Sequence, residues 1–169
     1  DSGSLACWGD NAFGQCDLPA SNVGFTQIAA GYGHTLALRQ GDTLYAWGLD
    51  DVGQCQVPDN AGQFTQVAAG GFHSAACRSN GSVACWGWNV YGQSSVPAGL
   101  GPVSMVTAGG RHTVALMADG TVACWGSNVY GQSSVPNKLG TVSMLAAGRS
   151  HTVALMADGS VMFWGSNGS

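Results

Sequence analysis

The chain has 169 residues, of which 45% are hydrophobic and only 8% are charged, and its formal net charge is −4. This composition allows a buried core, but no apolar run approaches the roughly 18 residues of a membrane helix, so we expect a soluble protein without membrane insertion. Five Lys and Arg residues do not make the basic surface that binds phosphate backbones, so nucleic acid is not an expected partner.

One unit recurs along the chain at a constant interval. The dipeptide Trp-Gly returns every 39 residues, at Trp8, Trp47, Trp86, Trp125 and Trp164. Histidines keep the same interval, at His34, His73, His112 and His151. A period between about 20 and 50 residues is typical of solenoids, propellers and arrays. We therefore treat residues 1–169 as a single repeat domain with the units Trp8–Trp47, Trp47–Trp86, Trp86–Trp125 and Trp125–Trp164.

The elements of a unit are predicted to be strands. In the third unit, 103-VSMVTA-108 is the first strand and the Gly-Gly-Arg turn at 109–111 follows it. The runs 113-TVALM-117 and 121-TVACW-125 form a hairpin, because the glycine of the intervening Ala-Asp-Gly can take a positive φ. Equivalent hairpin turns are expected at Gly41, Gly81 and Gly159. The segment 133-SSVP-136 is expected to add a fourth, outer strand that ends at proline.

Strand direction assigns the connections to two faces. If the strand that ends at Ala108 runs up, the next strand runs down and the strand that ends at Trp125 runs up again. The turn 109–111 and the loop 126–132 then lie on one face, and the turn at Gly120 lies on the other. Helix signals are absent, since Gly makes up 27 of the 169 residues and no capped 3.6-residue period occurs. We expect an all-β chain.

The stretch 108-AGGRHTVALMADGTVACWGSNVYGQ-132 resembles the repeat of the regulator of chromosome condensation family, and four consecutive copies carry the pattern. The resemblance implies β-propeller blades, usually seven of four strands each. Family members include a nuclear guanine-nucleotide exchange factor, modules of ubiquitin ligases, a plant ultraviolet photoreceptor and a secreted bacterial inhibitor of β-lactamases. The short units are similar to those of the inhibitor and leave no room for the inserted β-wedge of the exchange factor. The resemblance therefore implies fold more than function.

The two ends of the chain occupy the same phase of the repeat. The stretches 3-GSLACWG-9 and 159-GSVMFWG-165 are copies of one strand and would compete for one place in a ring of four units. The four units are therefore expected to be a segment of a larger, seven-bladed propeller, part of a multi-chain assembly or an open array. Exposed apolar unit ends favour association.

The repeated residues are interpreted as scaffold. Each tryptophan is expected to pack between units, and each histidine to bond a polar group of the neighbouring unit rather than a metal. Histidine and the following Thr or Ser point to opposite faces of a strand, so they do not form a nucleophile–base pair. No acids are paired at a repeated spacing. We therefore expect a non-catalytic protein with no cofactor and no bound metal.

The cysteines and two sequons bear on compartment. Cys77 and Cys85 flank one hairpin turn and are the candidate disulfide, provided that the hairpin register brings them together. Asn80-Gly81-Ser82 and Asn167-Gly168-Ser169 are N-glycosylation triplets. Together with the near absence of lysine, these features favour a secreted or extracellular protein over a cytoplasmic one.

The variable positions on the first face are the candidate binding site. Aromatic residues and arginine are enriched at protein interfaces. The candidates are Tyr32, Phe72, Trp88, Tyr91, Arg111, Tyr130 and Arg149. An alternative for Tyr91 and Tyr130, which share one position of the repeat, is that they only cover their loops. We expect a scaffold that binds another protein or further copies of itself. An extracellular structural or carbohydrate-associated glycoprotein and an exchange regulator of a small GTPase are the alternatives.

Overall fold

The computed structural model describes residues 3–41, 43–58 and 63–168, and all regular elements in these ranges are β-strands. No helix that could span a membrane occurs among these residues. The strands are β1 (Phe25–Ala30), β2 (His34–Arg39), β3 (Thr43–Gly48), β4 (Phe64–Ala69), β5 (His73–Arg78), β6 (Val83–Gly87), β7 (Val103–Ala108), β8 (His112–Met117), β9 (Val122–Gly126), β10 (Val142–Ala147), β11 (His151–Met156) and β12 (Val161–Gly165).

Each unit forms one antiparallel sheet of three consecutive strands, in the orders β1-β2-β3, β4-β5-β6, β7-β8-β9 and β10-β11-β12. The second and third strands are joined by the expected hairpin, whose glycine has a positive φ of 84° at Gly120. The first and second strands of every sheet share a register shift, which falls between Val103 and Met105 in the third unit. There the hydroxyl of Ser104 donates to the carbonyl oxygen of Leu116 across the pair, at 3.1 Å.

The expected fourth strand does not form in the described residues, where 134–136 are irregular. The preceding loop explains this result, because it uses its own backbone donors. The amide of Ser133 donates to Asn128 Oδ1 at 3.0 Å, and the amide of Ser134 donates to the carbonyl oxygen of Gly131 at 3.0 Å. Pro136 has no amide hydrogen to offer. The prediction of four-stranded blades was therefore wrong for this chain, whose sheets have three strands.

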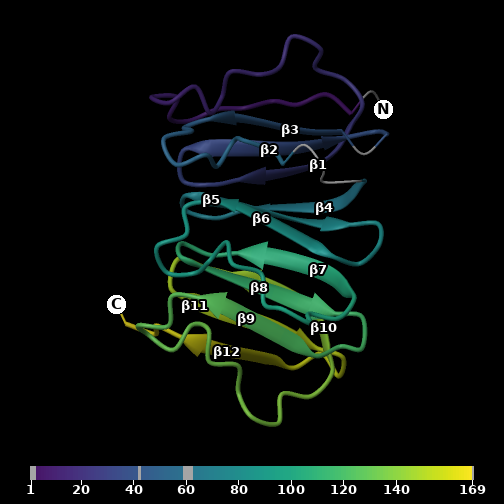
Figure 1. Ribbon diagram of the computed structural model, residues 1–169, viewed down its shortest axis with the longest axis vertical. Coiled ribbons are helices and arrows are strands. Elements are labelled where there is room, and N and C mark those ends of the chain that lie inside the picture. Colours follow the sequence, from purple (N-terminus) through teal and green to yellow (C-terminus); the bar gives the residue numbers. More distant parts are fainter. Residues whose placement is uncertain (1–2, 42, 59–62, 169) are drawn as a thin grey trace.

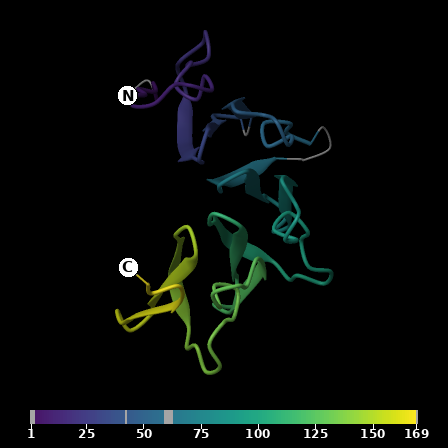
Figure 2. The ribbon, with the colours of Figure 1, turned by 90° about the vertical axis from the view of Figure 1, so that its left-hand side faces the viewer.

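The four sheets follow one another along an arc that does not close into a ring, and both chain ends lie on its open side (Figures 1 and 2). The first strands of successive sheets are neighbours, with β4 beside β1, β7 beside β4 and β10 beside β7. The expectation of antiparallel propeller blades in an open segment is thus confirmed.

The apolar core lies between neighbouring sheets rather than inside them. In the layer between the third and fourth sheets, Val114 and Leu116 of β8 pack against Val142, Leu145 and Trp164 of the last sheet. Equivalent layers join the first sheet to the second and the second to the third. Each sheet therefore depends on its neighbours for burial, as expected for a repeat protein.

Residues 3–9 belong to no sheet, although they repeat the sequence of a third strand. The segment still contacts the first sheet, because the amide of Phe25 donates to the carbonyl oxygen of Gly3 at 2.9 Å. In the loop that follows, the carbonyl oxygen of Gln15 accepts hydrogen bonds from Thr35 Oγ1 and Trp47 Nε1, both at 2.9 Å. Trp8, which has no second strand beside it in the described residues, is 86% exposed. The repeat thus continues before β1 as a loop and lacks the sheet.

Candidate interaction surface

A chain of hydrogen bonds joins each sheet to the next, near the turn that precedes the second strand of each sheet. Between the second and third units, His73 Nε2 lies 2.9 Å from Thr113 Oγ1, and Thr113 Oγ1 donates to the carbonyl oxygen of Gln93 at 2.8 Å. Because the hydroxyl hydrogen goes to Gln93, the hydroxyl oxygen accepts from the ring, so Nε2 carries the proton. Trp125 Nε1 donates to the same Gln93 oxygen at 3.0 Å. The expectation that the histidines bond the neighbouring unit is confirmed for His34, His73 and His112, whereas His151 is exposed and has no described ring hydrogen bond.

The same bonds recur at the neighbouring joints. His34 Nε2 lies 3.0 Å from Ser74 Oγ, and His112 Nε2 lies 2.9 Å from Thr152 Oγ1. Ser74 donates to the carbonyl oxygen of Gln54 at 2.7 Å. Close packing accompanies the bonds, since a Cβ on Gly109 would lie 2.2 Å from His112 Cε1. Glycine is required there because only hydrogen fits in the space.

The buried histidines and thiols are held in their neutral forms. Burial lowers the pKa of His34 and His112 to about 4, and burial with the neighbouring histidines lowers the pKa of His73 to about 3. Burial raises the pKa of the Cys77 thiol to about 11 and that of Cys124 to about 12. Neutral thiols are poor nucleophiles. Among the described residues, no three His, Cys or Asp side chains group as metal ligands.

The turn before each second strand and the loop after each third strand lie on one face, as the strand directions predict. The amide of Trp88 donates to the carbonyl oxygen of Phe72 at 2.9 Å, and the amide of Ser127 donates to that of Arg111 at 2.8 Å. Successive turns are also bonded to each other, since Gly71 N donates to the carbonyl oxygen of Gly109 at 3.1 Å. These bonds bring variable side chains from three units together.

Internal hydrogen bonds fix the loop that follows β6. Asn89 Oδ1 accepts from the amide of Ser94 at 2.9 Å, and Gln93 Oε1 accepts from the amide of Tyr91 at 2.9 Å. Ser94 Oγ donates to the carbonyl oxygen of Trp88 at 2.9 Å. The aromatic side chains of this loop are therefore carried by an ordered backbone, which reduces the entropy that binding must overcome.

Five of the seven candidate residues form one continuous cluster, which we call the aromatic–arginine cluster: Tyr32, Phe72, Trp88, Tyr91 and Arg111. The rings of Tyr32 and Phe72 are 5.3 Å apart, those of Phe72 and Trp88 are 5.9 Å apart, and those of Trp88 and Tyr91 are 5.4 Å apart. The Arg111 guanidinium lies 5.4 Å from the Trp88 ring and 5.1 Å from the Tyr91 ring. Arg111 Nη1 also donates to the Tyr91 hydroxyl at 3.1 Å.

The other two candidates, Tyr130 and Arg149, lie on the same face but make no described side-chain contact with the cluster. Tyr130 is 60% exposed, and its amide donates to Gln132 Oε1 at 2.8 Å. Arg149 is exposed, and its carbonyl oxygen accepts from the amide of Gly110 at 3.1 Å. Arg149 therefore stands beside the turn that carries Arg111. Its guanidinium forms no ion pair or hydrogen bond within the described residues.

Trp88 occupies a position at which two other units place an acceptor for the side-chain amide of the glutamine that follows. In the equivalent places, Asp10 accepts from Gln15 Nε2 at 3.4 Å and Ser127 accepts from Gln132 Nε2 at 3.3 Å. Gln93 is fully buried, and its Nε2 has no partner under Trp88. Gln54 Nε2, in the unit with Leu49 at this position, is also unpartnered. An unsatisfied buried donor costs about 1–3 kcal/mol, so Trp88 is unfavourable for the fold of its own loop.

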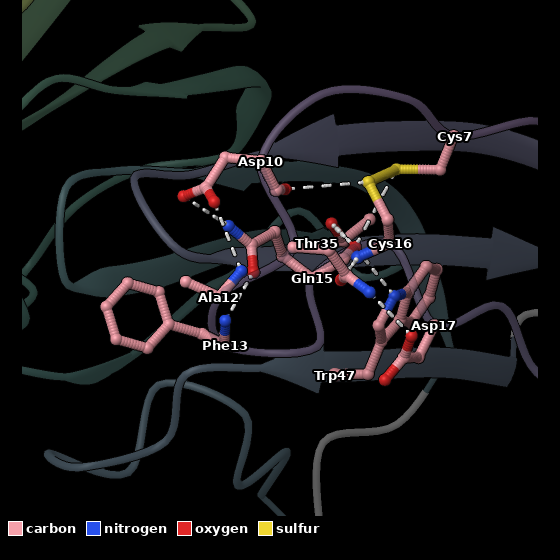
Figure 3. Close-up of a disulfide and its surroundings, with 10 residues drawn as sticks. Cys7, Asp10, Ala12, Phe13, Gln15, Cys16, Asp17, Thr35 and Trp47 are labelled. Atoms are coloured by element: carbon pink, nitrogen blue, oxygen red, sulfur yellow. Dashed lines mark hydrogen bonds between the residues drawn. A yellow bond between two sulfur atoms is a disulfide. The ribbon is translucent and has the colours of Figure 1, made fainter.

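The disulfide of the described residues joins Cys7 to Cys16, with Cα atoms 5.2 Å apart, beside the Gln15 carbonyl that Thr35 and Trp47 share (Figure 3). The expected Cys77–Cys85 disulfide was wrong, because the register places Cys77 opposite Val83 and Cys85 opposite Ala75.

The repeat contained the signal for the correct pair. Cys16 and Cys55 share one position of the unit, and Cys7, Cys85 and Cys124 share another. Only the copy with Cys7 and Cys16 has cysteine at both positions. In the next copy Cys55 is combined with Ala46, and in the following one Cys85 is combined with Ser94. A comparison of the two positions across the units would have identified the bond.

The two glycosylation candidates lie in different parts of the fold. Asn80 is exposed in the turn between β5 and β6, at the ends of the strands far from the aromatic–arginine cluster. Asn167 is exposed in the loop after β12, and the last residue of its triplet, Ser169, lies outside the described residues.

The matches to a protein family coincide with the structural units. A family model described as the Regulator of chromosome condensation (RCC1) repeat matches residues 25–54, 64–93, 103–132 and 142–169, more than half of the chain. The chain belongs to this family. The first three matches each run from the first strand of a sheet to the buried glutamine of the following loop. One RCC1 repeat is therefore one sheet with the loop that carries the variable residues.

Solved structures of other proteins are similar to this arrangement of sheets. The ectodomain of the receptor kinase CR4 from Physcomitrella patens has a TM-score of 0.83 and 28% identity over 98% of this chain and 48% of that chain. Human WBSCR16 has a TM-score of 0.74 and 26% identity over 89% of this chain and 50% of that chain.

Prp20p from Saccharomyces cerevisiae, a structure reported with its binding to Gsp1p and histones, has a TM-score of 0.74 and 19% identity over 88% of this chain and 46% of that chain. At that identity it shares the fold alone. The chain spans about half the length of these structures. No curated protein sequence matched the chain.

Proposed function

We propose that this RCC1-repeat chain is a non-catalytic scaffold that binds another protein through the aromatic–arginine cluster. The observation that carries the proposal is the contact chain from Tyr32 through Phe72, Trp88 and Tyr91 to Arg111, which crosses three units on one face. Tyr, Trp and Arg dominate the binding energy of protein interfaces. Ordered loops present these side chains, so binding requires little further ordering.

The position of Trp88 supports a role in binding. Its loop leaves Gln93 Nε2 buried without a partner, whereas Ser127 satisfies the equivalent donor in the next unit. Residues that oppose local stability are concentrated at functional sites. We therefore assign this large aromatic side chain, which contacts Phe72, Tyr91 and Arg111, to the binding surface.

Charge indicates the chemistry of the partner. The guanidinium of Arg149 has no described partner, and that of Arg111 contacts only two aromatic rings and the Tyr91 hydroxyl. Guanidinium groups bind carboxylates with two parallel hydrogen bonds. We therefore expect the partner to present an acidic side chain next to an aromatic or aliphatic one.

Selection from a random peptide library displayed on phage tests the proposal. We expect wild-type protein to select peptides that carry Asp or Glu beside an apolar residue. Their affinity should fall at least tenfold, or about 1.4 kcal/mol, in Trp88→Ser, which changes the cluster, and in Arg149→Gln beside it, which removes no side-chain hydrogen bond of the described residues. Lys138→Gln, which lies away from the cluster in the segment after Pro136, is the matched control. A library that yields no binder, or binders unaffected by changes to the cluster, would refute the proposal.

An extracellular glycoprotein remains the second candidate, and the Cys7–Cys16 disulfide favours it. Disulfides persist in oxidising compartments and are rare in the cytosol. Alkylation of the protein before and after reduction, followed by peptide mass analysis, tests this candidate on material taken directly from cells. Protected Cys7 and Cys16 with free Cys55 and Cys77 support it, and two free thiols at positions 7 and 16 exclude it.

An exchange regulator of a small GTPase has less support. The uniform 39-residue interval leaves no insertion that corresponds to a β-wedge between the units. An assay of nucleotide release from a panel of small GTPases separates this function from scaffold binding, and we expect no acceleration.

A further inference from the structure

The turn between β5 and β6 has the same hydrogen bonds as the turns of the two following units. Asn80 Oδ1 accepts from the amide of Ser82 at 2.9 Å and from its hydroxyl at 2.7 Å. Asp119 accepts from the amide and hydroxyl of Thr121 at 2.9 and 2.6 Å, and Asp158 accepts from those of Ser160 at 2.9 and 2.6 Å. In these three turns a side-chain oxygen at this position accepts both bonds, and Asp and Asn both supply it.

The turn makes no use of the amide nitrogen that distinguishes Asn80 from its aspartate counterparts. Asn80 is exposed, and its Nδ2 has no hydrogen-bond partner among the described residues. Both N–H groups of this amide are thus available, and a substituent on Nδ2 would point to solvent without breaking a contact. Ser82 completes the Asn-Gly-Ser triplet and holds its hydroxyl against the same amide.

The second triplet starts at a position where the two preceding units use both ends of the amide. Asn167 is the repeat equivalent of Asn89 and Asn128. Asn89 Nδ2 donates to Ser95 Oγ at 2.8 Å and Asn128 Nδ2 donates to Ser134 Oγ at 2.9 Å, while their Oδ1 atoms close the loop. A glycan on Nδ2 at this position would compete with the bond that orders the loop.

We propose that Asn80 is an N-glycosylation site and, by analogy with Asn89 and Asn128, that Asn167 is not. The co-reactant is a lipid-linked oligosaccharide pyrophosphate. Asn80 Nδ2 forms a bond to C1 of the first sugar and loses one proton, while the bond between C1 and the pyrophosphate oxygen breaks and the lipid pyrophosphate leaves. The proposal goes beyond the binding function and requires that the chain enters a secretory compartment, which the Cys7–Cys16 disulfide supports.

Asn80 lies at the opposite end of the strands from the aromatic–arginine cluster. β5 runs from His73, next to Phe72, to Arg78, just before the turn. Six residues of strand span roughly 20 Å. A glycan on Asn80 therefore leaves the loop face free for a protein partner, and it covers the hairpin side instead.

Secretion of the full chain from a eukaryotic cell line behind a signal sequence tests the proposal. We expect the intact mass to exceed the polypeptide mass by a single glycan, and peptide N-glycosidase to remove it and leave an acid at position 80. Asn80→Asp should abolish the glycan completely while it keeps the turn, because Asp119 and Asp158 make the same bonds. Ser82→Thr, which introduces the residue type that Thr121 supplies in the next unit, should retain the glycan, and Asn167→Asp should change nothing.

An unmodified wild-type chain, or a glycan that persists in Asn80→Asp, would overturn the proposal, and a second glycan lost in Asn167→Asp would overturn its selectivity. Binding of the selected peptides to glycosylated and enzymatically deglycosylated protein is the independent readout. Equal affinity is expected, since the glycan and the cluster lie on different sides. Absence of the glycan with intact peptide binding would reject this site and leave the proposed function in place.

Discussion

The same face of the repeat unit is buried in the third sheet and open in the fourth. Val114 and Leu116 of β8 are buried against the following sheet, whereas their counterparts Val153 and Leu155 of β11 are partly exposed and exposed. Phe163 of β12 is 60% exposed, although Cys124 in the equivalent place is half-buried. Near-identical strands thus have opposite surroundings, so burial here is a property of the neighbouring unit and not of the unit itself.

The comparison also separates residues that hold the scaffold from residues that vary on its surface. The hydrogen bonds among His73, Thr113 and Gln93 recur at each joint between the described sheets, and the aromatic–arginine cluster occurs once. Stability is therefore expected to respond to position along the arc, and binding to the few unit-specific side chains.

The largest difference between the two environments is expected for a buried charge. Leu116→Asp places a carboxyl group between two sheets and should destabilise the chain by about 5 kcal/mol or more. Leu155→Asp, the same change at the open face, should cost less than about 1 kcal/mol and should reduce the self-association expected of that face. Urea unfolding and sedimentation velocity at micromolar concentration measure the two effects. Equal destabilisation by both variants would contradict the comparison.

The next largest effect on the free energy of unfolding is expected from truncation of a buried tryptophan. Trp125 is buried and donates to the Gln93 carbonyl oxygen, so Trp125→Ala should lower the free energy of unfolding by roughly 3–5 kcal/mol. Trp8 has the same place in its repeat and is almost fully exposed, so Trp8→Ala should change it by less than about 0.5 kcal/mol. Urea titrations compare the pair, and an unchanged midpoint for Trp125→Ala would exclude its role in packing.

Acid is expected to weaken the joints between units. Burial lowers the pKa of His34 and His112 to about 4 and that of His73 to about 3, so the unfolded chain binds more protons below pH 6.5. Stability from these groups is fully present above pH 6.5 and is lost as the pH falls towards 4, at about 1.4 kcal/mol per pH unit for each histidine. Denaturant unfolding between pH 7.5 and 4.5 measures the slope, and His112→Gln should reduce it. A flat profile would show that the rings are accessible to protons.

The smallest of these effects concerns one hydroxyl. Thr113→Val removes the acceptor of the His73 ring N–H and should cost about 1–3 kcal/mol. Thr35 makes only the bond to Gln15 and receives none from a preceding histidine in the described residues, so Thr35→Val should cost less than about 1 kcal/mol. Thermal and urea unfolding of the two variants provide the test. A larger loss of stability for Thr35→Val than for Thr113→Val would contradict a stabilising role of the His73–Thr113 bond between units.

The period of the sequence predicted the strands well, because each strand is bounded by glycine turns that repeat with it. The prediction of a strand at 133–136 was wrong, because the amides of Ser133 and Ser134 donate hydrogen bonds within their own loop. Local propensity does not reveal such competition for backbone donors.

The candidate surface was predictable in part for a similar reason. Strand direction places the variable turn and loop on one face, which brought Phe72, Trp88 and Arg111 together. The repeat pattern does not predict the direction in which a side chain extends. Arg111 extends towards Tyr91, in the loop that follows the preceding sheet, so the cluster ends there and does not continue to Tyr130.

The most direct test of binding through the cluster is the affinity of Trp88→Ser for the selected peptides, measured by calorimetry beside its urea stability. Serine occupies this position in the next unit, where Ser127 accepts from Gln132 Nε2. We expect at least tenfold weaker binding, with stability unchanged or increased by about 1 kcal/mol because Gln93 Nε2 gains an acceptor. Unchanged affinity, or a loss of affinity that accompanies a loss of stability, would contradict the assignment of Trp88 to binding.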